Sequence, residues 1–427
     1  MHNRINHNKS RSGLTAALDI GTTKIGCLIA SANASAGASG VKGLRVAGFG
    51  HQISRGMRSG TIVDIENVEA AIRSTVEAAE QMAGENIKEV VVNLSGGKPK
   101  SRLIAYEISI AGHKIGDSDL RRILDPQALG AEQPADRELI HTIPVGYSID
   151  GNRGVRDPRG MYGERLGVNM HVVSATHGPM RNLETAIARC HLGIESMVVT
   201  PYASALACLV EDEKQMGVTY IDFGGGTTSV AVFFDGELVH TDTIPVGGQH
   251  VTNDIARGLA TPMPHAERMK TLYGNVIPSA SDDHAVIKVP LVGEEDSAEE
   301  SQVPRSMLVG IIRPRIEETL ELVRDRLVRA GFDKVAGRRA VISGGASQLL
   351  GMPELTGRIL DKQVRVGRPQ VLAGAPETAA GPAFSTCAGL LRYAFEDSKE
   401  IPNFTYGIEA EPSGRFGRLG QWLKENF

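Results

Sequence analysis

The sequence contains no long hydrophobic run. Nowhere in its 427 residues does a segment approach the roughly 20 consecutive apolar residues that a membrane-spanning helix needs. The first residues, 1–13, are polar and basic and have no apolar centre, which argues against a secretory signal peptide. We therefore expect a chain that is soluble or lies on a membrane surface without crossing it.

Cysteine, aromatic residues and net charge are all in short supply. The four cysteines form no CxxC pair and lie mostly among apolar residues. This predicts buried thiols in a reducing compartment rather than disulfides or metal ligands. The formal net charge is −4, and so balanced a chain does not have the basic character of a nucleic-acid binder. With 41% hydrophobic residues, an ordinary globular fold is expected.

Several common catalytic signatures are also missing. There is no GxxxxGK[ST] P-loop, no HExxH zinc motif and no GxSxG nucleophile elbow. Zinc chemistry and serine hydrolase chemistry are therefore poorly supported. Glycine, by contrast, is plentiful, with 49 residues, and several glycines stand where apolar runs end. Glycine at such places lets the backbone approach a ligand closely.

Two segments far apart in the chain repeat one pattern, an apolar run that ends in Asp, then Gly, then paired Thr. They are Asp19–Thr23 and Asp222–Thr228. The glycines let backbone N–H groups approach phosphate oxygens, and the threonines add hydroxyl donors. Asp19 and Asp222, at the strand ends, can hold Mg²⁺ through water. Either motif alone suits an ordinary turn, but the repeat, with a third turn at Gly344-Gly345, predicts a site for a nucleoside triphosphate.

These motifs resemble the phosphate and adenosine motifs of the actin superfamily. Two further segments resemble the FtsA family of bacterial cell-division proteins: Gly56-Met57-Arg58-Ser59-Gly60-x-Ile62-Val63-Asp64-Ile65 and Asp157-Pro158-x-Gly160-Met161-x-Gly163-x-x-Leu166. The resemblance covers about residues 14–395 and recurs at the C-terminal tip. It implies an α/β, actin-like two-lobed ATPase fold with ATP and Mg²⁺ in the cleft, an FtsA-type inserted subdomain and a C-terminal amphipathic helix.

The resemblance also implies how the chain divides into subdomains. Subdomain 1A comprises 14–92, 174–217 and 370–395, subdomain 1C is the insertion 93–173, subdomain 2A comprises 218–248 and 307–369, and subdomain 2B comprises 249–306. Residues 1–13 are expected to form a disordered tail, 396–412 a linker, and 413–427 a membrane-targeting amphipathic helix. Helical spacing of apolar residues predicts helices over 61–83 and over 251–273.

The ATP-binding residues that the resemblance implies come from all three turns. They are Gly21, Thr22, Thr23 and Lys24 in the first, Gly224, Gly225, Gly226 and Thr227 in the second, and Gly344, Gly345 and Ala346 in the third. Gly247 would close the lobe of the second hairpin, and Glu267 and Lys270 on one helix would reach the ribose. Without the resemblance, the last two would be taken for a solvated helical pair.

One position departs from the chaperones of this superfamily. They place Glu-Pro at the start of a helix in the cleft, where the carboxylate helps to position water. Here the same position reads Thr200-Pro201. Loss of that carboxylate removes a candidate water-orienting group or general base. We expect weak or no ATPase activity, with Asp222 as a weak water-positioning group and ATP as a ligand that closes the cleft and favours assembly.

The C-terminal segment 413–427, SGRFGRLGQWLKENF, has an amphipathic pattern. At 100° per residue the apolar stripe comprises Phe416, Leu419, Leu423 and Phe427, with Trp422 and Arg415 on its flank and Arg418, Gln421 and Lys424 facing away. Basic residues beside an aromatic-bearing apolar stripe suit an interfacial helix on an anionic membrane. A helix packed on its own domain is the alternative. The resemblance favours the membrane, because FtsA proteins end in a membrane-targeting helix.

The resemblance therefore implies an ATP-binding adaptor that polymerises on the cytoplasmic face of the inner membrane at the division septum. Its expected partners are the tubulin-like protein FtsZ, other copies of the chain in a filament, downstream membrane division proteins and the anionic membrane surface. The C-terminal tail of FtsZ would meet residues 249–306, and the downstream proteins would meet 93–173. A metabolite kinase on the same fold is the alternative, although no catalytic Asp facing a sugar pocket is evident. A chaperone would need a substrate-binding domain after Phe395.

Overall fold

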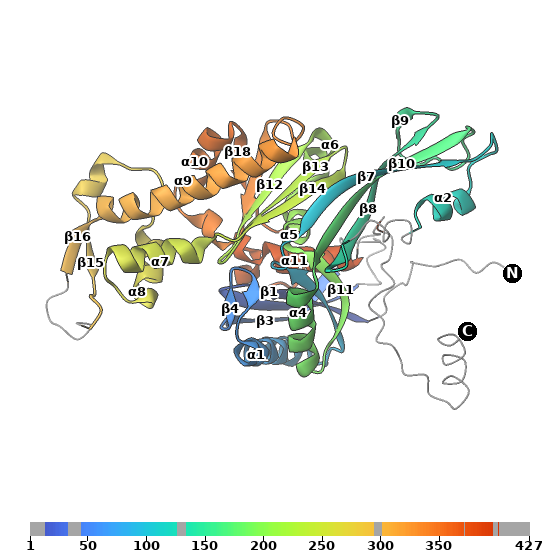
Figure 1. Ribbon diagram of the computed structural model, residues 1–427. Helices are drawn as coiled ribbons and strands as arrows, with labels where there is room; N and C mark the ends of the chain where they lie inside the picture. The colour runs from blue at the N-terminus through green and yellow to red at the C-terminus, as the bar shows by residue number, and fades with distance from the viewer. Residues whose placement is uncertain are drawn as a thin grey trace.

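The computed structural model describes residues 13–32, 44–125, 134–293, 301–370, 372–395 and residue 400. The predictions for the N-terminal tail, for most of the 396–412 linker and for the 413–427 tip fall outside the described residues. Within the described part, none of the helices is both long enough and apolar enough to traverse a bilayer. The described residues form two lobes and an insertion, which Figure 1 shows from one side.

The two lobes are built on sheets of the same topology. The first has the order β11-β6-β1-β2-β3 and consists of β1 (Leu14–Ile20), β2 (Lys24–Ala32), β3 (Leu44–Ile53), β6 (Glu89–Leu94) and β11 (Gly193–Val199). Written in the same direction, the second has the order β18-β17-β12-β13-β14. It consists of β12 (Val218–Phe223), β13 (Thr228–Phe234), β14 (Glu237–Ile244), β17 (Arg339–Ser343) and β18 (Gln363–Val366). Asp19 and Asp222 lie near the ends of corresponding strands. The predicted two-lobed α/β fold is confirmed.

Helices join the lobes and cover the first sheet. α1 (Ile65–Ala83) packs on β2 and β3, beside α4 (His177–Arg189), while α5 (Thr200–Cys208) and α11 (Ser385–Phe395) lie between the two sheets (Figure 1). α1 begins four residues later than the 61–83 prediction places it, because the Asp64 side chain caps it by accepting from the Asn67 amide. A Cβ on Gly389 of α11 would lie 1.7 Å from the Ala203 carbonyl oxygen of α5. The close crossing of these helices therefore requires glycine.

The helices that pack in the second lobe are α6 (Glu211–Met216) on β13, and the group α7 (Gly248–Gly258), α8 (Met263–Tyr273), α9 (Arg305–Ala330) and α10 (Met352–Leu360). The hairpin of β15 (Val286–Val289) and β16 (Ser301–Pro304) lies beyond α8 (Figure 1). The prediction of one helical stretch over 251–273 is wrong. Ala260 has a left-handed φ of 49°, and Pro262 is the N-cap of α8. The apolar spacing continues across this break, but the backbone turns.

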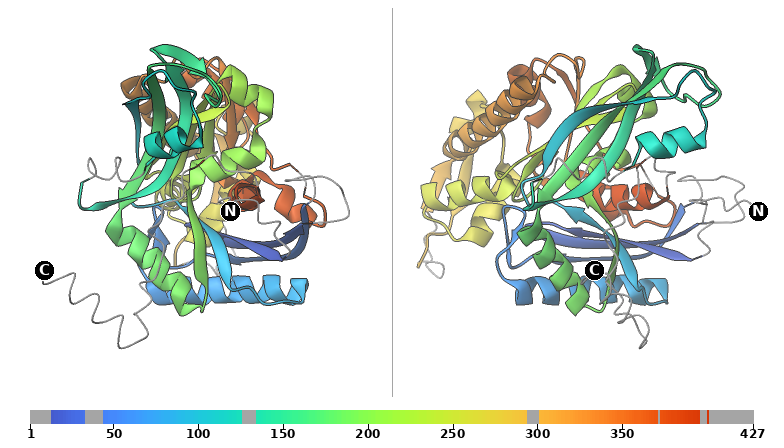
Figure 2. Two further views of the ribbon diagram at one scale, coloured as in Figure 1. Left: turned by 90° about the vertical axis from the view of Figure 1, so that its right-hand side faces the viewer. Right: turned by 45° about the vertical axis from the view of Figure 1, so that its right-hand side comes forward.

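The insertion forms a separate four-stranded sheet with its own small core. Its elements are β7 (Lys100–Ser109), α2 (Asp117–Ile123), β8 (Arg137–Ile149), β9 (Asn152–Val155) and β10 (Arg165–Thr176), and the strand order is β7-β10-β8-β9. Figure 2 shows this sheet from two further directions. Its base touches the second lobe, where the Thr241 amide of β14 donates to Ser101 Oγ over 3.2 Å.

Glu400 lies in the segment predicted as a linker and is held against the folded lobes. The Tyr393 hydroxyl donates to its carboxylate over 2.9 Å, and Nδ1 of the buried His141 lies 3.1 Å from the same oxygen. The Val199 amide donates to His141 Nε2, so Nδ1 is the ring nitrogen that carries the proton in the neutral tautomer. Residue 400 is therefore tied to α11 and to β8 of the insertion.

Candidate functional site

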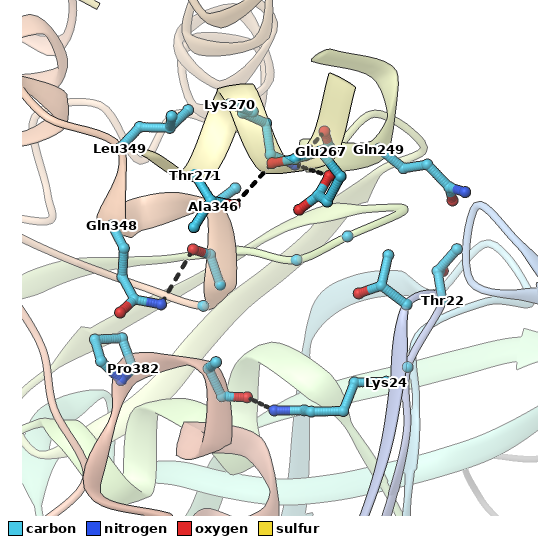
Figure 3. Close-up of a pocket in the computed structure, with 18 of the residues that line it drawn as sticks. Thr22, Lys24, Gln249, Glu267, Lys270, Thr271, Ala346, Gln348, Leu349 and Pro382 are labelled. Atoms are coloured by element: carbon cyan, nitrogen blue, oxygen red, sulfur yellow. Dashed lines mark hydrogen bonds and ion pairs between the residues drawn. The ribbon is translucent and has the colours of Figure 1, made fainter. Parts of the chain in front are cut away.

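A cavity of about 620 Å³ lies between the lobes and receives both predicted phosphate hairpins. This volume falls within the range of ordinary ligand pockets. Of the residues predicted to bind ATP or metal, those that line the cavity are Asp19, Gly21, Thr22, Thr23, Lys24, Asp222, Gly224, Gly225, Gly226, Thr227, Glu267, Lys270, Gly344, Gly345 and Ala346. The fold thus brings three distant turns together. Figure 3 shows Glu267 and Lys270 on one side of the cavity and Thr22 and Lys24 on the other.

The two hairpins have the same local construction. In the first, the Gly21 amide donates to the Lys24 carbonyl over 3.0 Å, and in the second the Gly224 amide donates to the Thr227 carbonyl over 2.9 Å. A Cβ on Gly21 would lie 2.7 Å from the Lys24 carbonyl oxygen, so a side chain cannot enter this turn without displacing backbone. The repeated glycines of the sequence pattern are therefore required by turn geometry at both sites.

The tips of the two hairpins touch each other across the cleft. A Cβ on Gly225 would lie 2.5 Å from the side chain of Thr23, and a Cβ on Gly226 would lie 2.2 Å from Thr22 Oγ1. Atoms at these distances overlap, so only glycine lets the hairpins approach this closely. Gly-Thr turns from both lobes consequently line one small region, and such turns are suited to an anion.

The two aspartates are buried beneath the hairpins. Burial raises the pKa of Asp19 to about 7; Lys24 partly opposes this effect and Asp222 adds to it. Burial also raises the pKa of Asp222, although a weak hydrogen bond of 3.4 Å from Thr386 Oγ1 favours its ionised form. Two buried carboxyl groups with too little positive charge nearby are suited to a cation.

Lys24 is held at the floor of the cavity. Its ammonium group donates to the Ala383 carbonyl and lies 3.3 Å from the centre of the Phe384 ring. Burial lowers the pKa of Lys24, although the neighbouring Asp19 partly opposes this effect. The turn η6 (Pro382–Phe384) that leads into α11 therefore fixes the one lysine of the first hairpin (Figure 3).

Lys270 and Gly247 support the second hairpin from behind. Lys270 Nζ donates to the Gly248 carbonyl over 3.1 Å, to Thr252 Oγ1 over 2.8 Å and to Glu267 Oε2 over 2.6 Å. Gly247 is not among the residues that line the cavity. It is the N-cap of α7, and a Cβ there would lie 2.6 Å from the Gly224 carbonyl oxygen. Both residues thus hold α7 against the turn, and Glu267 is left half exposed at the cavity edge.

Several residues that line the cavity were not predicted. Beside the two hairpins this is Ser95, whose hydroxyl oxygen lies 2.8 Å from that of Thr200, the residue already expected at the start of the cleft helix. At the other end they are Asn275, Arg305, Gln348, Leu349 and Leu350. Ser95 follows a buried strand, as the residues of the two hairpins do, and that signal was available in the sequence. In the second group, Gln348, Leu349 and Leu350 continue the predicted third turn, while Asn275 and the first residue of α9, Arg305, come from separate segments that carry no motif.

Comparisons with known proteins identify relatives of this chain. A family model described as "Cell division protein FtsA" matches residues 219–389, and one described as "SHS2 domain inserted in FTSA" matches residues 96–174. The chain is 45% identical to cell division protein FtsA of Agrobacterium fabrum, over 98% of this chain and 96% of that protein. It is 30% identical to FtsA of Escherichia coli, over 97% and 98% of the two chains.

Solved structures share the fold at lower identity. A chain of the PilM–PilN type IV pilus biogenesis complex has a TM-score of 0.63 at 17% identity and covers 90% of this chain and 98% of its own. MreB5 of Spiroplasma citri bound to ADP has a TM-score of 0.52 at 13% identity, with 90% and 96% covered. The MamK double helical filament also has a TM-score of 0.52 at 13% identity, with 91% and 99% covered.

Proposed function

This chain belongs to the FtsA family of cell-division proteins, and we propose that it is an ATP-binding adaptor that polymerises on the cytoplasmic face of the inner membrane and tethers FtsZ filaments at the division septum. The observation that most supports this proposal is one cavity between the lobes. Each lobe contributes a Gly-Thr hairpin and an aspartate to its lining. No feature of the described cavity favours the metabolite kinase alternative.

The residues present fit a nucleoside triphosphate. Amides and hydroxyls of the two hairpins would hold the phosphates, and a side chain at Gly225 or Gly226 would overlap Thr23 or Thr22. Glu267, at the cavity edge, would reach the ribose, and Lys270 would keep it in place through their 2.6 Å ion pair. The MreB5 structure with ADP and the MamK filament support nucleotide binding and polymerisation on this fold.

Asp19 and Asp222 fit Mg²⁺, because both carboxyl groups are buried and the charge of Asp222 acts on Asp19. Each has its pKa raised by burial, so each gains from a cation. When bound, Mg²⁺ would neutralise phosphate charge, and the two carboxylates would hold it through its water ligands. The chain itself supplies the buried negative charge and the neighbouring hydroxyls.

The affinity for Mg²⁺–ATP is expected to rise with pH. Asp19 has a pKa of about 7 in the folded chain, so its ionised fraction rises about tenfold between pH 6 and pH 8, and protons compete with the cation below pH 7. The raised pKa also means that, without a cation, the free energy of unfolding falls as pH rises from about 4 to 7. Nucleotide titrations with and without Mg²⁺ at pH 6 and pH 8 measure how the affinity for ATP depends on pH. Asp19→Asn is the control for titration of ATP itself, and an equal pH dependence in both proteins would contradict the assignment.

Slow hydrolysis is part of the proposal. Thr200 begins α5 at the cavity, and its hydroxyl oxygen lies 2.8 Å from Ser95 Oγ and 3.3 Å from Asn93 Nδ2. Among the described residues that line the cavity, the carboxylates are Asp19, Asp222 and Glu267. Asp222 is thus left as a weak water-positioning group, and ATP would act mainly by holding the lobes together.

FtsZ would dock on the subdomain formed by residues 249–306, while downstream membrane division proteins would meet the insertion. Apolar side chains are exposed on adjoining elements at the far end of the second lobe. Val286 of β15 is 61% exposed and pairs with Pro304, and Met307 lies three residues further on at the start of α9. An apolar surface of this kind suits the side chains of a short peptide tail.

FtsZ should sediment with anionic vesicles only when this chain is also present. Val286→Asp is expected to weaken recruitment of FtsZ about tenfold or more, because it puts a charge into the apolar contact. Val328→Asp is the matched control, since Val328 is 54% exposed at the other end of α9. If Val286→Asp recruits FtsZ as well as Val328→Asp does, the docking surface lies elsewhere.

A further inference from the structure

A short hairpin wraps the outside of the first phosphate turn. Its strands are β4 (Met57–Arg58) and β5 (Thr61–Ile62), and its turn residues Ser59 and Gly60 have φ of 46° and 77°. Two left-handed residues in a two-residue loop are typical of a type I′ turn. This hairpin belongs to the motif 56–65, to which the proposed function gives no role.

The hairpin makes one buried hydrogen bond to the site. The Gly60 amide donates to Thr22 Oγ1 over 3.0 Å, and nearby the Ser54 amide donates to the Thr23 carbonyl over 3.0 Å. An amide can only donate, so Thr22 Oγ1 must accept. The hydroxyl hydrogen of Thr22 is then left to point elsewhere, and Thr22 lines the cavity.

Phosphate oxygens only accept hydrogen bonds, so they need a donor. Without the Gly60 contact, the Thr22 hydroxyl can rotate and turn its hydrogen in several directions. With the Gly60 amide donating to its oxygen, one lone pair is used, and the hydrogen must point away from the amide. Hydrogen bonds to charged groups are among the stronger ones in proteins.

The Ser59-Gly60 turn is also closely surrounded by other parts of the chain. A Cβ on Gly60 would lie 2.9 Å from the Ser95 carbonyl oxygen and 3.1 Å from Thr227 Cγ2 of the other lobe. A Cβ on Gly96 would lie 2.3 Å from the Gly60 carbonyl oxygen. The turn therefore sits where the phosphate hairpins of the two lobes meet and has no room for a larger residue.

We propose that Gly60 is a positioning residue for the phosphate site, because its amide orients the Thr22 hydroxyl as a donor to phosphate oxygens. This inference rests on the proposed nucleotide binding and deepens it. Gly60 does not touch the ligand; it acts through Thr22. The Ser59-Gly60 turn places that amide, and the packing against Ser95 and Thr227 keeps it there.

The test compares two glycines in the same kind of turn. Gly151, in the two-residue turn between β8 and β9, has φ of 82°, follows Asp150 with φ of 50°, and has no atom within 4 Å of its Cβ position. Gly60→Ala and Gly151→Ala thus place alanine at similar left-handed φ angles, with similar backbone strain. Only at position 60 would the new Cβ contact other atoms. Gly60→Ala is expected to weaken ATP binding at least about tenfold and to leave adenosine binding unchanged. Gly151→Ala should bind both as the unaltered chain does.

Thr22→Val keeps the test decisive if Gly60→Ala does not fold. It removes the hydroxyl at nearly constant shape and should cost ATP affinity a similar factor, while Thr22→Ser should retain most of it. The double variant Gly60→Ala/Thr22→Val should be no weaker than Thr22→Val alone, because both changes remove one interaction. Additive losses, or a Thr22→Val chain that binds ATP normally, would overturn the inference alone. An unaltered chain that binds no ATP would overturn the proposed function, and this inference with it.

Discussion

Gly226→Val is expected to lower the affinity of the chain for ATP by about a hundredfold or more. An ideal Cβ at this position would lie 2.2 Å from Thr22 Oγ1 and 2.7 Å from Thr22 Cβ, so even the first carbon of valine forces the hairpins apart. Separated hairpins lose at least two hydrogen bonds to charged phosphate oxygens, each of which contributes about 1.5–3 kcal/mol. Since about 1.4 kcal/mol corresponds to a factor of ten, the losses multiply to the predicted factor.

The same variant should lose the thermal stabilisation that a ligand gives to a folded protein. Excess ATP raises the unfolding temperature of the unaltered chain in proportion to the logarithm of its concentration over Kd, and this rise should vanish in Gly226→Val. Gly146→Val is the control, because Gly146 lies in β8 and nothing lies within 4 Å of its Cβ position. ATP affinity within threefold of normal in Gly226→Val would mean that contact between the hairpins is not needed for binding.

Trp422→Glu is expected to abolish binding to anionic vesicles, as is truncation after residue 412. The predicted apolar stripe of residues 413–427 would contribute at most about 6–12 kcal/mol, at about 1.5–3 kcal/mol for each of four large side chains. Ordering a helix there would cost much of this, at about 1 kcal/mol or more per residue. A single helix would thus be a weak anchor, and one buried charge would suffice to release it. Polymers that present many helices gain avidity, so ATP should strengthen binding.

Sedimentation with anionic vesicles, with and without ATP and Mg²⁺, measures this prediction. Gln421→Glu is the matched control: it adds the same charge on the face predicted to point away from the membrane, and it should retain binding. Neutral vesicles should bind all of these proteins weakly, because the basic residues of the tip need anionic headgroups. If the unaltered chain, Trp422→Glu and the truncation all sediment alike, the tip packs on its own domain and the adaptor loses its anchor.

The sequence predicted the two Gly-Thr hairpins because their construction is local. A turn that exposes amides to an anion needs glycine at Gly21 and Gly224 whatever surrounds it, and an apolar run that ends in Asp marks a strand end at Asp19 and Asp222 alike. The family comparison and the matching strand orders of the two sheets confirm the fold class drawn from these motifs. The subdomain boundaries and the individual binding roles remain predictions.

Other features depended on contacts that no local pattern encodes. Apolar spacing runs unbroken from α7 into α8, yet the chain turns at Ala260, where the Val292 amide donates to its carbonyl from a distant segment. Lys270 has the sequence context of a surface residue, but its ammonium is buried by three acceptors. Burial and partner choice are properties of the packed lobes, so spacing within one helix could not reveal them.

The sequence by itself thus determined the two Gly-Thr turns, the strand-end carboxylates and the family to which the chain belongs, since each depends on residues adjacent in the chain. Only the tertiary structure brought Gly225 and Gly226 against Thr23 and Thr22 of the other lobe, where a Cβ would overlap them. It also placed the Gly60 amide within hydrogen-bonding distance of Thr22 Oγ1. These roles arise where segments far apart in the chain come within hydrogen-bonding or van der Waals distance, and that proximity exists only once both lobes have folded and closed on each other.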